Sequence, residues 1–209
     1  FPAHFAFRVT RGHDLTFIVK LFTFCQGDLY FCAAFFEVNL NRNNTCSGNN
    51  YGIWLGSSGH NTMSNNTLNA NDYGIYQYYS NNCVVLDNTC NGNTQAGIML
   101  QSSNSNTISG NDLGQNQIGI YLFTSNSNNI TDNDCRNNSL YNIWLQSSGS
   151  NTLSANDCSG NTHIGMFLEE SQDNVISNNN CSGTIDYGID LSASCLLYTS
   201  PSPRDYCAH

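Results

Sequence analysis

Three aspartates recur at a regular interval in the chain and could bind a cation. Asp112, Asp134 and Asp157 are separated by 22 and 23 residues. Carboxylates held about 5 Å apart on neighbouring strands would repel one another, so they would either take up protons or recruit a cation such as Ca²⁺. No EF-hand or nonapeptide Ca²⁺ motif accompanies them. We therefore interpret them as solvated surface acids, expect no cofactor, and keep a Ca²⁺ site as the alternative.

The residues that sugar-cleaving chemistry needs are sparse. A glycosidase uses two carboxylates across a cleft, and a β-elimination lyase uses a base and commonly a cation. Between residues 42 and 194 the only basic side chains of Lys or Arg type are Arg42 and Arg136. The best acid–base grouping consists of His163, Glu169, Glu170 and Asp173, in an expected turn. We expect no catalytic site, and keep as the alternative a fragment of a polysaccharide lyase, hydrolase or epimerase whose catalytic loops lie elsewhere.

Aromatic side chains recur at the same interval and could bind carbohydrate. One column holds Trp54, Tyr76, Met99, Tyr121, Trp144, Phe167 and Asp190. Two residues further on, a second column holds Gly56, Tyr78, Gln101, Phe123, Gln146, Glu169 and Ser192. Such a surface suits sugars, whose C–H faces stack on rings while their hydroxyls form hydrogen bonds with amides and carboxylates. Alternatively, the rings stabilise a sheet through contacts with one another, or are covered by residues 1–38.

These positions belong to a repeat of 22 or 23 residues that extends from about residue 43 to 194. Gly-Ile or a close variant recurs seven times, from Gly52-Ile53 to Gly188-Ile189. Within each unit the apolar residues alternate, which is strand spacing, and no run of helix-forming residues occurs. This pattern favours a β-helix over a leucine-rich repeat. It predicts an all-β fold, a single-stranded parallel β-helix of about seven coils, each hydrogen-bonded to the next about 4.8 Å away.

Strand alternation also predicts which columns lie inside. The Ile and Leu columns should face inward, and the aromatic column outward with the Gly column beside it. A further column consists of Cys46, Leu68, Cys90, Leu113, Cys135, Cys158 and Cys181. Because Leu replaces Cys there, we interpret these cysteines as small buried hydrophobes rather than as metal ligands or disulfides. Two Asn columns, which begin at Asn44 and Asn49, should stack as amide ladders in buried turns.

Charge and hydropathy exclude two classes of partner. A net charge of −9 argues against binding to nucleic acid or to an anionic membrane surface. The apolar stretch 15–36 contains Lys20 and Asp28, so we do not expect it to insert into a membrane. The chain starts at Phe1 rather than Met, so we expect a fragment or a processed product, and the lack of a signal peptide does not argue against export.

The periodicity is lost outside residues 43–194. Residues 1–42 form an aromatic-rich flank that could cap the open end of the helix or be out of frame. Residues 195–209 form a tail that we expect to be disordered or artefactual, because Leu196 to Asp205 resembles translated sequencing-adapter sequence. Four further cysteines, Cys25, Cys32, Cys195 and Cys207, lie in these flanks.

The repeat has a family resemblance. The run Asn-x-[Ile/Leu/Val]-Ser-x-Asn, followed by Gly-Ile-x-Leu-x-x-Ser, is clear from Asn106 to Ser125. It resembles the right-handed parallel β-helix repeat of NosD-type proteins, in the wider carbohydrate-binding and sugar-hydrolase (CASH) group, over about 150 residues. The resemblance implies right-handed coiling. It also implies, as a further alternative, a periplasmic accessory in copper-enzyme maturation. No catalytic motif of the group can be carried over to this chain.

The sequence therefore predicts a non-catalytic, exported β-helix module, located outside the cell, at its surface or in the periplasm. We expect it to present its aromatic column to a polysaccharide or cell-surface glycan. The expected contact residues are Trp54, Tyr76, Tyr78, Tyr121, Phe123, Trp144 and Phe167.

Overall fold

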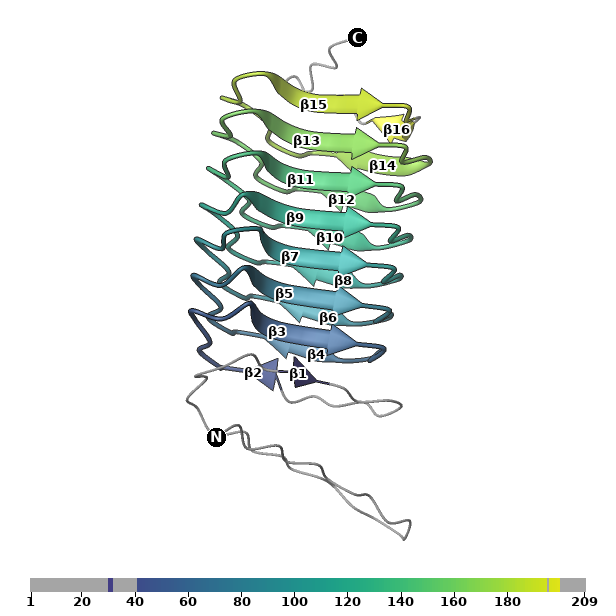
Figure 1. Ribbon diagram of the computed structural model, residues 1–209. Helices are drawn as coiled ribbons and strands as arrows, with labels where there is room; N and C mark the ends of the chain where they lie inside the picture. Colours follow the sequence, from purple (N-terminus) through teal and green to yellow (C-terminus); the bar gives the residue numbers. More distant parts are fainter. Residues whose placement is uncertain (1–29, 32–40, 195, 200–209) are drawn as a thin grey trace, which may run out of the picture.

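The computed structural model describes residues 30–31, 41–194 and 196–199, and in these ranges the chain is a parallel β-helix (Figure 1). Each coil contributes one strand to each of two parallel sheets, so strands adjacent in a sheet are one coil apart in sequence. The long-strand sheet contains β1 (Tyr30–Phe31), β3 (Tyr51–Gly56), β5 (Tyr73–Tyr78), β7 (Ala96–Gln101), β9 (Ile118–Phe123), β11 (Tyr141–Gln146), β13 (Ile164–Glu169) and β15 (Tyr187–Ser192).

The short-strand sheet lies on the other side of the core. It contains β2 (Asn41–Arg42), β4 (Thr62–Ser64), β6 (Val84–Leu86), β8 (Thr107–Ser109), β10 (Asn129–Thr131), β12 (Thr152–Ser154), β14 (Asn174–Ser177) and β16 (Leu196–Thr199). A third ladder is made of single-residue parallel bridges that join Thr45, Thr67, Thr89, Asp112, Asp134, Asp157 and Asn180. The predicted all-β parallel β-helix is confirmed. No helix among the described residues has the length and apolar character needed to cross a bilayer.

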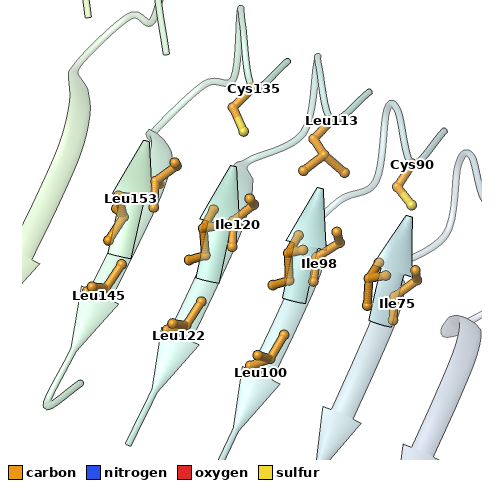
Figure 2. Close-up of a cluster of buried hydrophobic side chains, with 14 of the residues drawn as sticks. Ile75, Cys90, Ile98, Leu100, Leu113, Ile120, Leu122, Cys135, Leu145 and Leu153 are labelled. Carbon is orange, nitrogen blue, oxygen red and sulfur yellow. The ribbon is translucent and has the colours of Figure 1, made fainter. Parts of the chain in front are cut away.

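Equivalent side chains of successive coils stack into one continuous core. Ile53, Ile75 and Ile98 pair in register and are fully buried, and the Leu column beside them is equally inaccessible. Figure 2 shows Leu113 between Cys90 and Cys135, all three pointing into the core beside the Ile and Leu columns. The mixed Cys and Leu column therefore lies inside, as its composition predicts.

The Asn columns form the expected ladders at the turns. The backbone N–H and the side-chain amide of Asn66 both donate to Oδ1 of Asn88, at 3.0 and 2.8 Å. Asn88 donates in the same way to Asn111 in the next coil, at 2.9 and 3.0 Å. Each buried amide is thus a partner for the coil on either side, which satisfies polar groups that no water reaches.

The Gly column does not lie beside the aromatics, contrary to the prediction from alternation. A Cβ added to Gly52 would lie 2.6 Å from the carbonyl oxygen of Gly74 and 3.0 Å from Cβ of Leu68, so this position faces inward. The strand pairing passes from Tyr51–Tyr73 directly to Ile53–Ile75. Two consecutive residues therefore face the core at the start of each long strand. Glycine suits Gly52 because the next coil's backbone occupies the space of a side chain, and the one larger residue of the column, Asn142, is buried with its amide hydrogen-bonded.

Gln77 interrupts the buried Leu column. It pairs in register with Leu55 on one side and Leu100 on the other, and its side chain is fully buried. Neither its amide nitrogen nor its amide oxygen has a hydrogen-bond partner in the part of the chain that the structure describes. An amide in this position is expected to destabilise the coil.

Parallel pairing extends on both sides of the repeat seen in the sequence. Tyr30–Phe31 pairs with β3, Asn41–Arg42 pairs with β4, and β16 pairs with β14 through an irregular register. The rest of the aromatic-rich flank and of the tail lies outside the described residues. So do Cys25, Cys32, Cys195 and Cys207.

Candidate functional site

The outer surface of the long-strand sheet carries three columns of outward side chains, which we call the aromatic face. The central column contains Trp54, Tyr76, Met99, Tyr121, Trp144 and Phe167; a second contains Tyr51, Tyr73, Ala96, Ile118, Tyr141 and Ile164; and a third contains Gly56, Tyr78, Gln101, Phe123, Gln146 and Glu169. None of these side chains belongs to the main core. Ala96, Met99 and Ile118 are nevertheless buried, and six surrounding rings pack on them as a separate apolar cluster.

The structure brings three of the predicted contact residues into one stack. Tyr121 and Trp144 lie 4.2 Å apart between ring centroids with planes 8° apart, and Trp144 and Phe167 lie 6.2 Å apart at 26°. The three residues pair in register on β9, β11 and β13, so Trp144 has a ring on either side. A ring stacked in this way presents its edge rather than its faces to solvent. The stacked rings are therefore only partly exposed, because their faces contact one another.

The other predicted rings have different surroundings. Tyr76 packs edge-on against Tyr51 and Tyr73, with centroids 5.3 Å away in both cases. Phe123 lies 6.4 Å from Tyr121 at a tilted angle. Tyr78 packs edge-on against the exposed Tyr79, with ring centroids 4.4 Å apart.

Trp54 covers Gly56 on its own strand. A Cβ added to Gly56 would overlap Cη2 of Trp54. The glycine at this position of the first coil thus makes room for the indole, where the equivalent residue of the next coil is Tyr78.

Sequence reasoning missed the second column of the aromatic face. Tyr51 and Tyr73 stack with centroids 5.6 Å apart, and Tyr141 lies 5.2 Å from both Trp144 and Phe167. These tyrosines immediately precede the Gly column and recur at the same interval as the other positions. That interval was the available signal, but strict alternation placed glycine, not tyrosine, beside the aromatic column.

Two tyrosine hydroxyls are held by glutamines of the next coil. The hydroxyl of Tyr76 donates to Oε1 of Gln101, and the hydroxyl of Tyr121 donates to Oε1 of Gln146. Burial raises the pKa of Tyr76 and of Tyr121 to about 12, with a smaller contribution from neighbouring phenols and, at Tyr121, from Glu169. Both hydroxyls therefore keep their protons at neutral pH and remain donors.

Charge is confined to one end of the aromatic face. Strands β3, β5, β7, β9 and β11 contain no charged residue, whereas β13 ends in Glu169 and β15 contains Asp190. His163 and Asp186 lie just before these last two strands and are joined by a 2.9 Å contact between Nδ1 and Oδ2. The acid–base grouping of the sequence is thus replaced by a half-exposed His–Asp pair, in which Asp186 was not foreseen.

The three aspartates considered for Ca²⁺ lie in the third ladder and face a cationic side chain. Arg136 donates from Nε to Oδ1 of Asp134 at 2.7 Å, and its Nε lies 3.8 Å from Oδ2 of Asp157. The hydrogen bond from Arg136 lowers the pKa of Asp134. Oδ2 of Asp112 accepts from the amide of Asn91 at 3.0 Å. A cation at this column would compete with a guanidinium already in place, and no group of three acidic, Cys or His side chains within the described ranges is arranged to hold a metal.

Two protein-family models match the chain. The model described as "Periplasmic copper-binding protein (NosD)" matches residues 32–141, which is more than half of the chain. The model described as "Right handed beta helix region" matches residues 99–200, in agreement with the handedness that the sequence resemblance implied. No curated protein matches the chain significantly.

Solved structures share the fold at low sequence identity. The periplasmic alginate epimerase AlgG is 19% identical with a TM-score of 0.58, and 76% of this chain covers 44% of that one. The A-module of the mannuronan C-5 epimerase AlgE4 of Azotobacter vinelandii is 16% identical with a TM-score of 0.64, covering 78% of this chain and 58% of that one. The Dettilon tailspike protein is 17% identical with a TM-score of 0.53, covering 72% and 41%. The chain thus spans about half the length of these proteins.

The copper named in the family description does not fit the thiols of this chain. Cys135, Cys158 and Cys181 stack in three consecutive coils, but they are buried in the core. Burial, followed by contacts with the two flanking thiols, raises the pKa of Cys158 well above its ordinary value. A copper ion needs thiolates or imidazoles that converge on one point, whereas these buried thiols follow the helix axis among Ile and Leu side chains.

The repeat, the parallel coils and the extent of the match agree, and the chain belongs to the NosD family of right-handed parallel β-helix proteins.

Proposed function

We propose that this chain is a non-catalytic β-helix module that binds carbohydrate through its aromatic face. The observation that carries the proposal is the band of rings, phenol hydroxyls and amides on β3, β5, β9 and β11, continued across β7 by Met99 and Gln101, which contains no charge. A contiguous apolar patch on a protein surface is typical of an interaction site. Rings combined with neutral hydrogen-bonding groups suit sugars better than they suit a purely apolar partner.

The mutual packing of the rings favours binding rather than opposing it. Tyr121, Trp144 and Phe167 are already held by their neighbours, so a ligand would immobilise few side chains. Ligand contacts at this stack would be made by ring edges and by the polar groups beside them. The surface would act as a rigid, preformed platform.

The similar proteins and the family support an exported, glycan-related role. Two of the similar structures are named as epimerases of alginate or mannuronan, which are long polysaccharides. The family description names the periplasm. We therefore place this module outside the cytoplasm, and propose that a long sugar chain lies against its coils. No catalytic step is part of the proposal.

Affinity electrophoresis through gels that contain single polysaccharides tests the proposal. The panel contains β-glucan, mannan, xylan, alginate and polygalacturonate. We expect at least one of them to retard the protein, and the Trp144→Ala variant to lose most of the retardation. The matched control is Leu86→Ser, because Leu86 is an exposed apolar side chain on the short-strand sheet, away from the aromatic face. Circular dichroism establishes that both variants keep the fold.

The possible results distinguish binding at the aromatic face from binding elsewhere and from no binding. Retardation that Trp144→Ala abolishes and Leu86→Ser leaves intact supports binding at the aromatic face. Absence of retardation across the panel, or equal retardation of folded wild type and Trp144→Ala, refutes it. New reducing ends or unsaturated products during incubation would contradict the non-catalytic assignment.

A further inference from the structure

The two tyrosine–glutamine pairs of the aromatic face are equivalent. Each joins the central column of one strand to the third column of the next, from Tyr76 on β5 to Gln101 on β7 and from Tyr121 on β9 to Gln146 on β11. In both pairs the residues are 25 positions apart. The same small hydrogen-bonded unit is therefore repeated after two coils.

Each pair presents one acceptor and one donor group to a ligand. The phenol hydroxyl donates its hydrogen to Oε1 of the glutamine, so its oxygen is left to accept a hydrogen bond from a ligand. In both glutamines the tyrosine engages Oε1, which leaves the Nε2–H groups of Gln101 and Gln146, on partly exposed side chains, to serve as donors. A sugar hydroxyl both donates and accepts, and can satisfy the two groups together.

The separation of the pairs matches one type of sugar chain. Two coils advance the helix by about 10 Å, because neighbouring strands are roughly 4.8 Å apart. In an extended β-1,4-linked glycan, each hexose lengthens the sugar chain by a distance close to the rise of one protein coil. Every second hexose turns the same edge towards a surface on which the glycan lies. Equivalent contacts every second coil therefore fit equivalent edges of every second sugar.

The charge of the aromatic face selects against anionic chains. Between residues 43 and 194 eleven carboxylates stand against the single cation Arg136, and Arg136 is paired with Asp134 in the third ladder. At the end of the face, Glu169 and Asp190 add negative charge, and no Lys or Arg lies on strands β3 to β15. A polyuronate would meet repulsion with no compensating ion pair.

From these observations, and resting on the proposed carbohydrate binding, we infer that the two tyrosine–glutamine pairs are equivalent subsites for a neutral, extended β-1,4-linked glycan that runs parallel to the helix axis. Tyr76 with Gln101 contacts one sugar, and Tyr121 with Gln146 contacts the second sugar along. This specificity sets the chain apart from the alginate epimerases that share its fold.

Calorimetric titration with defined tetrasaccharides tests the inference. β-1,4-Mannotetraose and tetra-β-1,4-mannuronate have the same linkage and configuration and differ in the carboxylate; cellotetraose and chitotetraose extend the neutral set, and maltotetraose changes the linkage. We expect a neutral β-1,4 tetrasaccharide to bind at least about 10-fold more tightly than tetramannuronate at low salt. Tyr76→Phe and Tyr121→Phe should each weaken that binding by roughly 3- to 10-fold, because each removes one hydrogen bond and keeps the ring. Leu86→Ser, which alters an exposed side chain of the short-strand sheet away from the aromatic face, is the control.

The results distinguish this inference from the function on which it rests. Preference for the neutral β-1,4 chain together with losses in both phenylalanine variants supports it. Tighter binding of tetramannuronate, equal binding of maltotetraose, or indifference to both variants overturns it, even where Trp144→Ala still abolishes binding and so upholds the aromatic face. Failure of every sugar to bind overturns both.

Discussion

The buried amide of Gln77 offers a sharp test of the stacked core. Gln77 occupies a position that is leucine in both neighbouring coils, and its side chain reaches neither water nor a hydrogen-bond partner in the described residues. Replacing it with leucine would restore the column. We therefore expect Gln77→Leu to stabilise the protein, an outcome that few substitutions of fully buried residues have.

The size of the effect follows from the lost polar group. A buried amide without partners lowers the free energy of unfolding by roughly 1–3 kcal/mol. Imperfect fit of the leucine would offset about 1 kcal/mol of the stability regained, at most. Taking the middle of that range, the net gain should be about 1–2 kcal/mol, which corresponds to a rise in Tm of roughly 2–8 °C for a domain of this size. Leu100→Gln, the reverse substitution one coil further along, should lower stability by about 3–5 kcal/mol.

Thermal and urea unfolding followed by far-ultraviolet circular dichroism measures both variants against wild type. A higher midpoint for Gln77→Leu and a lower one for Leu100→Gln agree with the column. If Gln77→Leu unfolds at the same midpoint as wild type, or below it, then the amide is satisfied where it stands and the reasoning is refuted.

Three further predictions concern the ladders and the phenols. Asn111→Ala should cost about 2–3 kcal/mol, because it removes the oxygen that accepts from the buried backbone N–H and side-chain amide of Asn88; equilibrium urea unfolding measures it, and a loss below 1 kcal/mol would contradict the ladder. Cys83→Asn should raise stability by about 1 kcal/mol, since Cys83 stands in an otherwise amide-lined ladder and accepts only a 3.5 Å contact from Asn61; an unchanged midpoint would count against this. Stability should fall as pH rises from 10 to 12, because Tyr76 and Tyr121 keep their protons in the folded state to a pKa of about 12 while unfolded phenols ionise near 10; phenolate absorbance that rises fully at pH 10 in folded protein would be the opposite result.

The fold was predictable because a solenoid translates one pattern along an axis. Once Ile53, Leu55 and Cys46 were each part of a column with one interval, their burial followed for every coil. The Asn ladders followed as well, because stacked identical amides have only each other and the nearby backbone as partners. Asn142 stands in the Gly column, but its buried amide takes part in the neighbouring Asn ladder. Its Oδ1 accepts from the side-chain amides of Asn138 at 3.1 Å and Asn161 at 3.0 Å.

The aromatic face was predicted less completely because its details depend on side-chain conformation. The interval located Trp144 and Tyr121, but not the stacking that covers their faces. Strict alternation misplaced Gly52, because two consecutive residues turn inward where the register skips a position. The contacts of Arg136 with Asp134 and of His163 with Asp186 depend on the conformations of surface side chains. The repeat pattern does not specify these conformations.

A ladder on the other side of the core was also missed. Asn106, Asn128 and Asn151 are buried and donate to one another in successive coils, at 2.8 Å from each backbone N–H. The same interval was present in the sequence. In the two preceding coils the equivalent positions hold Asn61 and Cys83. The cysteine interrupts the run of asparagines, which made the column harder to recognise.

The most direct test of the central claim uses tryptophan fluorescence. The protein contains two tryptophans, Trp54 and Trp144, and both lie on the aromatic face. In a Trp54→Phe variant, Trp144 is the sole reporter, held between Tyr121 and Phe167. Titration with a polysaccharide that retards the protein in gels should change its emission saturably, with the same midpoint as calorimetric binding. Calorimetric saturation with no change in Trp144 emission would place the sugar elsewhere and contradict the account.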